Sequence, residues 1–143
     1  MKPIYILVFT SIMTASVAAE TPFVPVPASE VVLADLLYLK RPVVVFANST
    51  ADPNFIRQME ILSSDPIGLD EQDVVVITDT DPANPSELRR KLRPSGFSLV
   101  IMDKDGKTTL RKPLPWAVRE IRNAIDKFPT AMIEQLERYP SGR

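Results

Sequence analysis

The sequence predicts an α/β fold in which a central four-stranded mixed sheet is flanked by helices. Two continuously apolar runs, Val43–Ala47 and Val74–Thr78, are separated by a helical pattern, as expected for parallel strands buried on both faces. A third apolar run, Phe97–Met102, precedes Asp105-Gly106, a strong hairpin signal, and the more polar segment Lys107–Lys112. We therefore expect the first two strands to be parallel and the last two to be antiparallel.

Helical patterns occupy the segments between and after these strands. Asp52 and Pro53 are typical of a helix start, and Ser29 resembles the cap of an earlier, short helix. Asn84 and Glu87 match the spacing of a capping box. A later helix and a short closing helix are indicated by apolar residues at helical spacing: Val118, Ile121, Ile125; Met132, Ile133, Leu136. Because the closing helix is short, we expect these last three residues to dock it on its own domain.

The N-terminus has the pattern of a cleavable signal peptide. Lys2 precedes an apolar run, and the small residues ending at Ala19 favour cleavage before Glu20. We expect a signal peptide at 1–19, a proline-rich leader at 20–29, one domain at 30–138 and a tail at 139–143. No later segment is long and apolar enough for a bilayer span, so we expect a periplasmic or secreted bacterial protein without a stable membrane anchor.

The composition excludes several kinds of chemistry. The chain has 17 basic and 18 acidic side chains, and this net charge of −1 argues against nucleic-acid binding. It contains neither cysteine nor histidine, so it lacks thiolate chemistry and the commonest general base. We therefore predict no catalytic residue, no metal site and no cofactor, and regard enzymatic activity as the less favoured interpretation.

The order strand–helix–strand–helix–strand–hairpin–strand–helix resembles that of thioredoxin-like proteins. Phe97–Gly106 is similar to the corresponding hairpin in exported members of that superfamily. The segments Leu39–Ala47, Gly96–Arg111 and Ile125–Glu134 resemble a narrower family of short, exported bacterial proteins, catalogued as domain of unknown function number forty-one seventy-four. The resemblance implies a thioredoxin-like fold and supplies no activity.

The chain departs from redox-active thioredoxins at the position that matters most for their chemistry. Those proteins carry Cys-x-x-Cys at the start of the first core helix, whereas the matching segment Ala51–Asn54 reads Ala-Asp-Pro-Asn. Without a thiolate, thiol–disulfide exchange is excluded. Their cis-proline position matches Phe97, and we expect an ordinary trans bond before it.

The loop between the first core strand and its helix is the best-placed binding candidate. Backbone amides at a helix start can hold an anion or a partner's carbonyl group, and Arg57 adds a positive charge. The alternative is that Asp52 or Thr50 simply caps the helix. The predicted recognition surface comprises seven residues: Asn48, Ser49, Thr50, Asp52, Asn54, Arg57 and Phe97.

Three interpretations of function remain at this point. The leading one is a non-redox binding or interaction domain for an unknown exported protein or small ligand. A second is an enzyme using the carboxylates Asp52 and Asp79, and a third is a structural subunit that packs through its closing helix.

Asp79/Asp81 and Asp103/Asp105 lack the spacing of a calcium loop, and the basic run Arg89–Arg93 is typical of a solvated helix face.

Overall fold

The computed structural model describes residues 20–140, so the predicted signal peptide lies outside the described residues. Its five-stranded sheet has the order β1-β3-β2-β4-β5, with β3 parallel to β1 and β2, and β4 antiparallel to β2 and β5. The elements are β1 (Val26–Pro27), η1 (Ala28–Glu30), α1 (Leu33–Leu36), β2 (Arg41–Phe46), α2 (Pro53–Ser63), α3 (Pro66–Glu71), β3 (Val74–Asp79), α4 (Glu87–Leu92), β4 (Ser98–Met102), β5 (Thr108–Lys112), α5 (Val118–Ile125) and α6 (Pro129–Arg138).

The sheet has one strand more than predicted in the described part of the chain. The extra strand, β1, comes from the segment expected to be an extended leader: Val26 pairs with Ile77 and Pro27 with Thr78. Phe23 also packs against the core, and Ala28 is buried. A two-residue strand has too little length for an alternating pattern, and proline is tolerated there because the strand lies at the edge. The leader segment therefore belongs partly to the packed domain.

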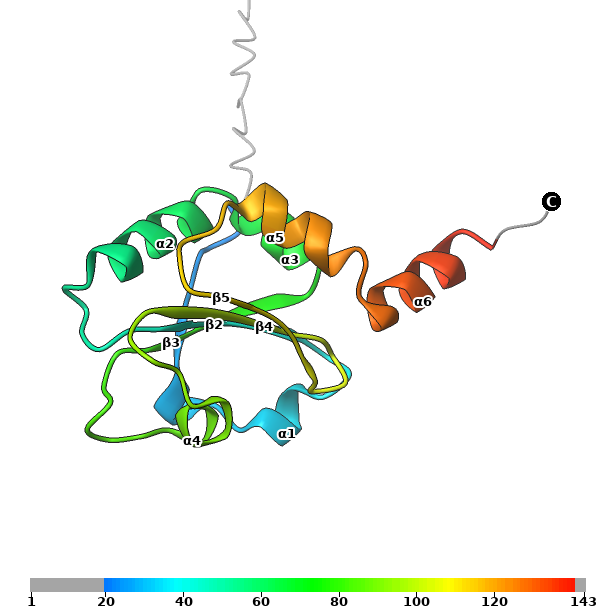
Figure 1. Cartoon of the computed structure of the whole chain (residues 1–143). Helices are drawn as coiled ribbons and strands as arrows, with labels where there is room; N and C mark the ends of the chain where they lie inside the picture. The colour runs from blue at the N-terminus through cyan, green and yellow to red at the C-terminus, as the bar shows by residue number, and fades with distance from the viewer. Residues whose placement is uncertain (1–19, 141–143) are drawn as a thin grey trace, which may run out of the picture.

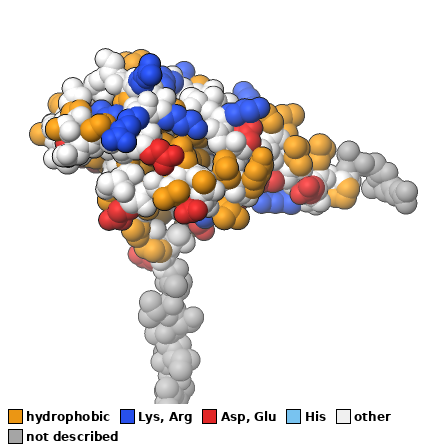
Figure 2. Space-filling model, turned by 90° about the horizontal axis from the view of Figure 1, so that it is seen from below, with side chains coloured by type: hydrophobic (Ala, Val, Ile, Leu, Met, Phe, Trp, Pro, Cys, Tyr) orange, Lys and Arg blue, Asp and Glu red, His pale blue; other side chains and the backbone are white. Residues whose placement is uncertain are grey.

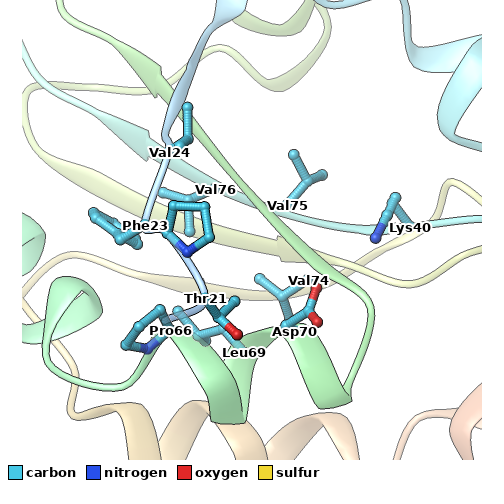
Figure 3. A pocket seen from close by; sticks show the side chains of 11 residues that line it. Thr21, Phe23, Val24, Lys40, Pro66, Leu69, Asp70, Val74, Val75 and Val76 are labelled. Atoms are coloured by element: carbon cyan, nitrogen blue, oxygen red, sulfur yellow. The ribbon is translucent and has the colours of Figure 1, made fainter. Parts of the chain in front are cut away.

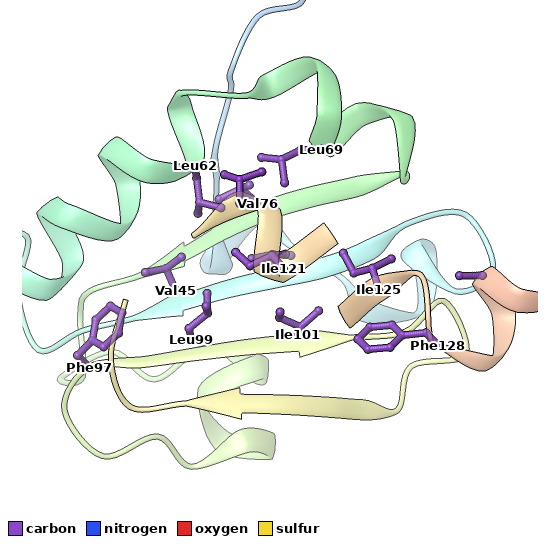
Figure 4. Close-up of a cluster of buried hydrophobic side chains, with 13 residues drawn as sticks. Val45, Leu62, Leu69, Val76, Phe97, Leu99, Ile101, Ile121, Ile125 and Phe128 are labelled. Carbon is purple, nitrogen blue, oxygen red and sulfur yellow. The ribbon is translucent and has the colours of Figure 1, made fainter. Parts of the chain in front are cut away.

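Helices cover both faces of the sheet, with α2, α3 and α5 on one side and α1 and α4 on the other (Figure 1). Along β2, Val43 and Val45 enter the hydrophobic cluster beneath the first group (Figure 4). Val44 and Phe46 enter the cluster on the opposite face. Because successive side chains of a strand point to opposite faces, two covered faces require an uninterrupted apolar run. This arrangement confirms the interpretation of the central strands.

The structure contains one helix that the sequence analysis did not identify, and one helix cap lies at another residue than expected. Pro66 begins the additional helix, α3, and the Asp65 carboxylate accepts the N–H of Gly68 at 2.9 Å as its cap. Ser86, and not Asn84, caps α4. Proline suits the first helical turn because that turn leaves its N–H groups unpaired within the helix. The same residue can therefore mark either a stop or a start.

A buried group of charged side chains attaches α6 to the domain. Arg41, at the start of β2, and Asp103, just after β4, are each 1% exposed, and Arg41 Nε lies 3.3 Å from Asp103 Oδ1. Arg41 Nη2 reaches Glu134 of α6 at 3.0 Å, and Lys104 Nζ reaches the other oxygen of Glu134 at 2.7 Å. Thr130 donates its hydroxyl to Asp103. We call these five residues the α6 anchor.

The predicted docking of α6 through its apolar residues is wrong. Met132, Ile133 and Leu136 are 54%, 56% and 60% exposed, and Ala131 is the buried residue of this helix. The helix projects from the body of the domain in both views (Figures 1 and 2). The spacing of apolar residues identified the helix correctly. The side of the helix that faces the domain is instead set by the α6 anchor, whose contacts join residues up to 93 positions apart, so local spacing does not reveal it.

The anchor predicts a loss of stability in acid. Burial by itself raises the pKa of Asp103, but hydrogen bonds from Thr130 and Lys104 and the charge of Arg41 outweigh it, and the pKa is held below its usual value. Glu134 has a lowered pKa because its bonds and charge interactions with Lys104 and Arg41 likewise outweigh burial. Since both pKa values are lower in the folded state, the stabilisation is fully present above the unfolded value of about 4 and is lost as pH falls through the folded values.

We therefore expect the free energy of unfolding to fall as pH drops below about 5, with the decline less steep in Glu134→Gln. Urea unfolding at a series of pH values measures both curves. A neutral exposed control, Thr109→Ala, should retain the wild-type decline. Equal slopes for wild type and Glu134→Gln would contradict the assignment.

Candidate functional site

The predicted binding loop lies where β2 ends and α2 begins. After β2 and the buried Ala47, the chain continues through four exposed residues: Asn48, Ser49, Thr50 and Ala51. Ala51–Asn54 occupies the junction between a central strand and its helix, as the sequence predicts. The loop therefore offers polar side chains at the carboxyl edge of the parallel strands β2 and β3, where α/β proteins commonly bind ligands.

Asp52 is the N-cap of α2. Its Oδ1 accepts the backbone N–H of Asn54 at 2.8 Å, and Pro53 occupies the first helical turn. The capping alternative considered from the sequence is therefore present in the structure. The cap also places a carboxylate beside the amides that an incoming anion would need, which disfavours anion binding. A neutral or basic partner suits this end of the helix better.

Replacement of the cap gives a direct stability prediction. Asp52→Ala leaves the backbone N–H of Asn54 without its acceptor and should lower the free energy of unfolding by about 1 kcal/mol. Thr50→Ala, two residues earlier in the exposed loop, should change it by less than about 0.5 kcal/mol. Urea denaturation compares the two variants. Equal stability of Asp52→Ala and wild type would show that the cap contributes nothing to folding.

A buried ion pair supports the base of the loop. Arg89 of α4 and Asp79 at the end of β3 are 8% and 6% exposed, and Arg89 Nη2 lies 2.9 Å from Asp79 Oδ1. Arg89 Nη2 also donates to the carbonyl oxygen of Ala47 at 3.0 Å, directly before the loop. Ser86 donates its hydroxyl to the second oxygen of Asp79 at 2.5 Å. The backbone that enters the loop is thus tied to α4 and β3.

The sequence interpretation of Arg89 as part of a solvated basic face is wrong. Leu88 and Leu92 are buried, and Arg89, next to Leu88, also turns inward because its guanidinium pairs with Asp79 at the end of β3. Its guanidinium lies over the Phe46 ring, 5.4 Å from the ring centre. A carboxylate at the end of an apolar strand, followed ten residues later by an arginine on a helix, was the available sequence signal.

These contacts weaken the carboxylate-enzyme hypothesis. Both oxygens of Asp79 are engaged by Arg89 and Ser86, and Asp81 accepts from Asn84 at 2.8 Å. A general acid or base must be free to exchange a proton with its substrate, whereas both carboxylate oxygens of Asp79 are already held by Arg89 and Ser86. Within residues 20–140, no group of three or more candidate metal-ligating side chains occurs.

The remaining predicted residues have unequal access to solvent. Phe97 is 8% exposed and packs in the core (Figure 4). Its neighbour Ser98, the first residue of β4, pairs with Phe46, the last residue of β2. Phe97 therefore lies at the same edge of the sheet as the loop. Arg57 is exposed and lies 3.6 Å from Glu60. No cis peptide bond occurs in residues 20–140, which agrees with the trans bond expected before Phe97.

Gln58 is a structural residue of this region that the sequence analysis missed. Its side chain is fully buried, and its amide group makes two hydrogen bonds to the backbone of Trp116. Nε2 donates to the Trp116 carbonyl at 2.9 Å, and Oε1 accepts the Trp116 N–H at 2.8 Å. These bonds join α2 to the segment between β5 and α5. A glutamine within an amphipathic helix carries no pattern that reveals such a long-range contact.

A cavity of about 330 Å³ lies away from the loop, between the N-terminal segment and the outer edge of β3 (Figure 3). Phe23 and Val24 line it from one side, and Val76 and Leu69 from the other, with Lys40 at one end. The cavity exists because β1 pairs only with Ile77 and Thr78, which leaves the earlier part of β3 without a neighbouring strand from β1. No residue of the predicted recognition surface belongs to it.

Within residues 20–140, no helix is both long and apolar enough to cross a membrane.

Comparison with known proteins places this arrangement in context. The sequence matches the family model DUF4174, a domain of unknown function, over residues 32–134. No curated protein matches the chain in sequence. Among solved structures, an N-terminally modified Prx1a of Plasmodium yoelii is 16% identical, with 79% of this chain and 84% of that chain covered and a TM-score of 0.52. Chloroplastic thioredoxin z is 22% identical, with 74% and 96% covered and a TM-score of 0.53.

At these identities the structural likeness shows the fold alone. It confirms the thioredoxin-like architecture, although the chain has no cysteine with which to perform thiol chemistry. The family match extends from before β2 into α6 and so includes the loop, the Asp79–Arg89 pair and all five residues of the α6 anchor. The chain belongs to the DUF4174 family and is a cysteine-free domain of thioredoxin-like fold.

Proposed function

We propose that this chain is an exported, non-redox interaction domain that recognises another exported protein through the loop Asn48–Asp52 and the first turn of α2. The proposal depends on one observation: an exposed polar loop follows a backbone that a buried ion pair holds in place. A preorganised loop loses less conformational entropy on binding than a mobile one.

The chemistry of the loop favours a protein partner over a small anion. Asn48, Ser49 and Thr50 offer both donors and acceptors, whereas the Asp52 carboxylate repels anions at the helix start. Arg57, one turn into α2, adds an exposed cation, and its Nη1 lies 3.6 Å from Glu60 Oε2. A partner surface with polar backbone or side-chain groups of both kinds would match this mixture.

Site-specific photo-crosslinking tests the proposal. A photo-reactive amino acid at Thr50 should form a covalent adduct with a discrete protein in an extract of the exported compartment. The matched control carries the same group at Thr109, an exposed threonine of β5 away from the loop. Arg57→Glu should reduce the Thr50 adduct without affecting folding.

Two results would overturn the proposal. Equal adducts at Thr50 and Thr109 would show non-specific capture. Absence of any adduct at Thr50, while a probe on another face captures a protein, would move the binding surface elsewhere.

A further inference from the structure

The cavity beside β3 contains a stretch of strand edge that no other strand of residues 20–140 covers. β1 pairs with β3 only at Ile77 and Thr78, and the chain before β1 moves away from β3. Figure 3 shows the N-terminal segment on one side of the cavity and β3 on the other, with α3 below them. The backbone of Val74–Val76 therefore forms an open sheet edge inside a cavity of about 330 Å³.

The ladder between β2 and β3 determines which backbone groups point into this cavity. The carbonyls of Asp73 and Asp79 accept N–H groups from the first residue of β2 and from the residue that follows β2, each at 2.9 Å. Because successive residues of a strand direct their backbone groups to opposite neighbours, the odd-numbered residues of β3 bond to β2 and the even-numbered residues point away from it. The N–H groups of Val74 and Val76 and the carbonyl of Val74 thus face the cavity.

The lining of the cavity is largely apolar and carries no net charge. Phe23, Leu69 and Val76 contribute apolar surface, and the two charged residues of the lining, Lys40 and Asp70, have opposite signs. A charged ligand that one of them attracts is repelled by the other, so neither an anion nor a cation is favoured. The ligand chemistry that fits combines apolar side chains with neutral hydrogen-bonding groups, as in a peptide.

We propose that the open edge of β3 binds an extended, uncharged apolar peptide segment of another protein as an added strand. Its carbonyls accept the N–H groups of Val74 and Val76, and one of its N–H groups donates to the Val74 carbonyl, as in other cases of strand addition. Its side chains on the α3 side of the sheet lie against Phe23 and Leu69. The open edge spans about 7 Å at ~3.3 Å per residue, so a segment of about three residues fills it.

A second copy of the chain is the competing occupant, because open edges can also pair with one another. The open edge of β3 lies in a recess, with the segment 21–24 along one side and α3 along another. This segment would separate the β3 edges of two folded copies. The recess therefore favours a narrow extended segment over a second domain.

Amide hydrogen exchange, followed residue by residue by NMR, tests whether the edge is open in the free protein. The N–H groups of Val74 and Val76 should exchange at least about 10-fold faster than those of Val75 and Ile77, which face β2. The last two residues are matched controls because they belong to the same strand. Equal protection of the four amides would show that the edge is already paired and would overturn the proposal.

Binding is tested with a pentapeptide of alternating valine and threonine, acetylated and amidated at its ends so that it carries no charge. At a peptide concentration about 10 times its dissociation constant, exchange at Val74 and Val76 should slow about 10-fold, whereas exchange at Val75 should not change. The control is the same peptide with methylated backbone nitrogens, which keeps the side chains but cannot form a ladder. It should leave the exchange rates unaltered.

A variant that fills the cavity separates this site from other surfaces. Thr21→Trp places a large side chain in the lining and should weaken peptide binding at least about 10-fold. Thr109→Trp, on the exposed strand β5, is the matched control and should bind as wild type does. Circular dichroism confirms that both variants are folded.

Four results would overturn the proposal. Three concern the peptide: no protection at millimolar concentration, an equal effect of the methylated peptide, or unchanged binding in Thr21→Trp. The fourth is protection of Val74 and Val76 that rises with protein concentration in the absence of peptide, which would assign the edge to a second copy of the chain.

Discussion

Arg41→Met should lower the free energy of unfolding by about 3–5 kcal/mol, a large effect for a single side chain. The substitution retains an apolar chain of similar reach but leaves Asp103, 1% exposed, without its buried cation. It also removes the donors that reach the Gln72 carbonyl at 2.9 Å and Glu134 at 3.0 Å. Removing one member of a buried pair is costly because the remaining charge stays desolvated. Urea unfolding measures the loss.

Two controls separate this explanation from a general cost of losing arginine. Arg57→Met removes an exposed arginine whose pair with Glu60 is 68% and 63% exposed, and should change stability by less than about 0.5 kcal/mol. Arg41→Met combined with Asp103→Asn should recover part of the loss, since the uncompensated charge is gone. A double variant as unstable as the sum of the two single variants would contradict the electrostatic explanation.

Arg89→Met should likewise cost about 3–5 kcal/mol, because it leaves the buried Asp79 carboxylate without its cation. The variant also removes the donor to the Ala47 carbonyl, so amide hydrogen exchange in Asn48–Asp52 should become faster than in wild type. The stability loss reports the ion pair, and the exchange rates report the support of the loop.

The adjacent residue provides the control for this second prediction. Arg90 lies on the same helix but is exposed, and Arg90→Met should change neither stability nor loop exchange appreciably. If Arg89→Met and Arg90→Met had the same small effect on the free energy of unfolding and on loop exchange, Arg89 would belong to a solvated basic face and the proposed role of the ion pair would be wrong. Loop exchange unchanged in Arg89→Met would show that the ion pair stabilises the domain without restraining the loop.

The sequence by itself determined the layered α/β architecture and the position of the cysteine-free junction. Continuous apolar runs such as Val43–Ala47 predict strands that are buried on both faces, and Asp105-Gly106 predicts a hairpin. Both predictions are possible from the sequence because each signal is carried by neighbouring residues. Asp52 as a helix cap is equally local. Each of these features depends on backbone preferences or periodicity within a few positions.

Only the tertiary structure decided which polar side chains are buried and which apolar ones are exposed. Arg41 meets Asp103 across 62 positions, and Gln58 meets Trp116 across 58, so neither pairing leaves a local pattern. The spacing of Met132, Ile133 and Leu136 identified a helix but not the surface it would face, since the anchor directs that face outward. A charged side chain can be buried only where the fold places an oppositely charged partner beside it. Periodicity along the chain does not reveal which distant residue that partner is.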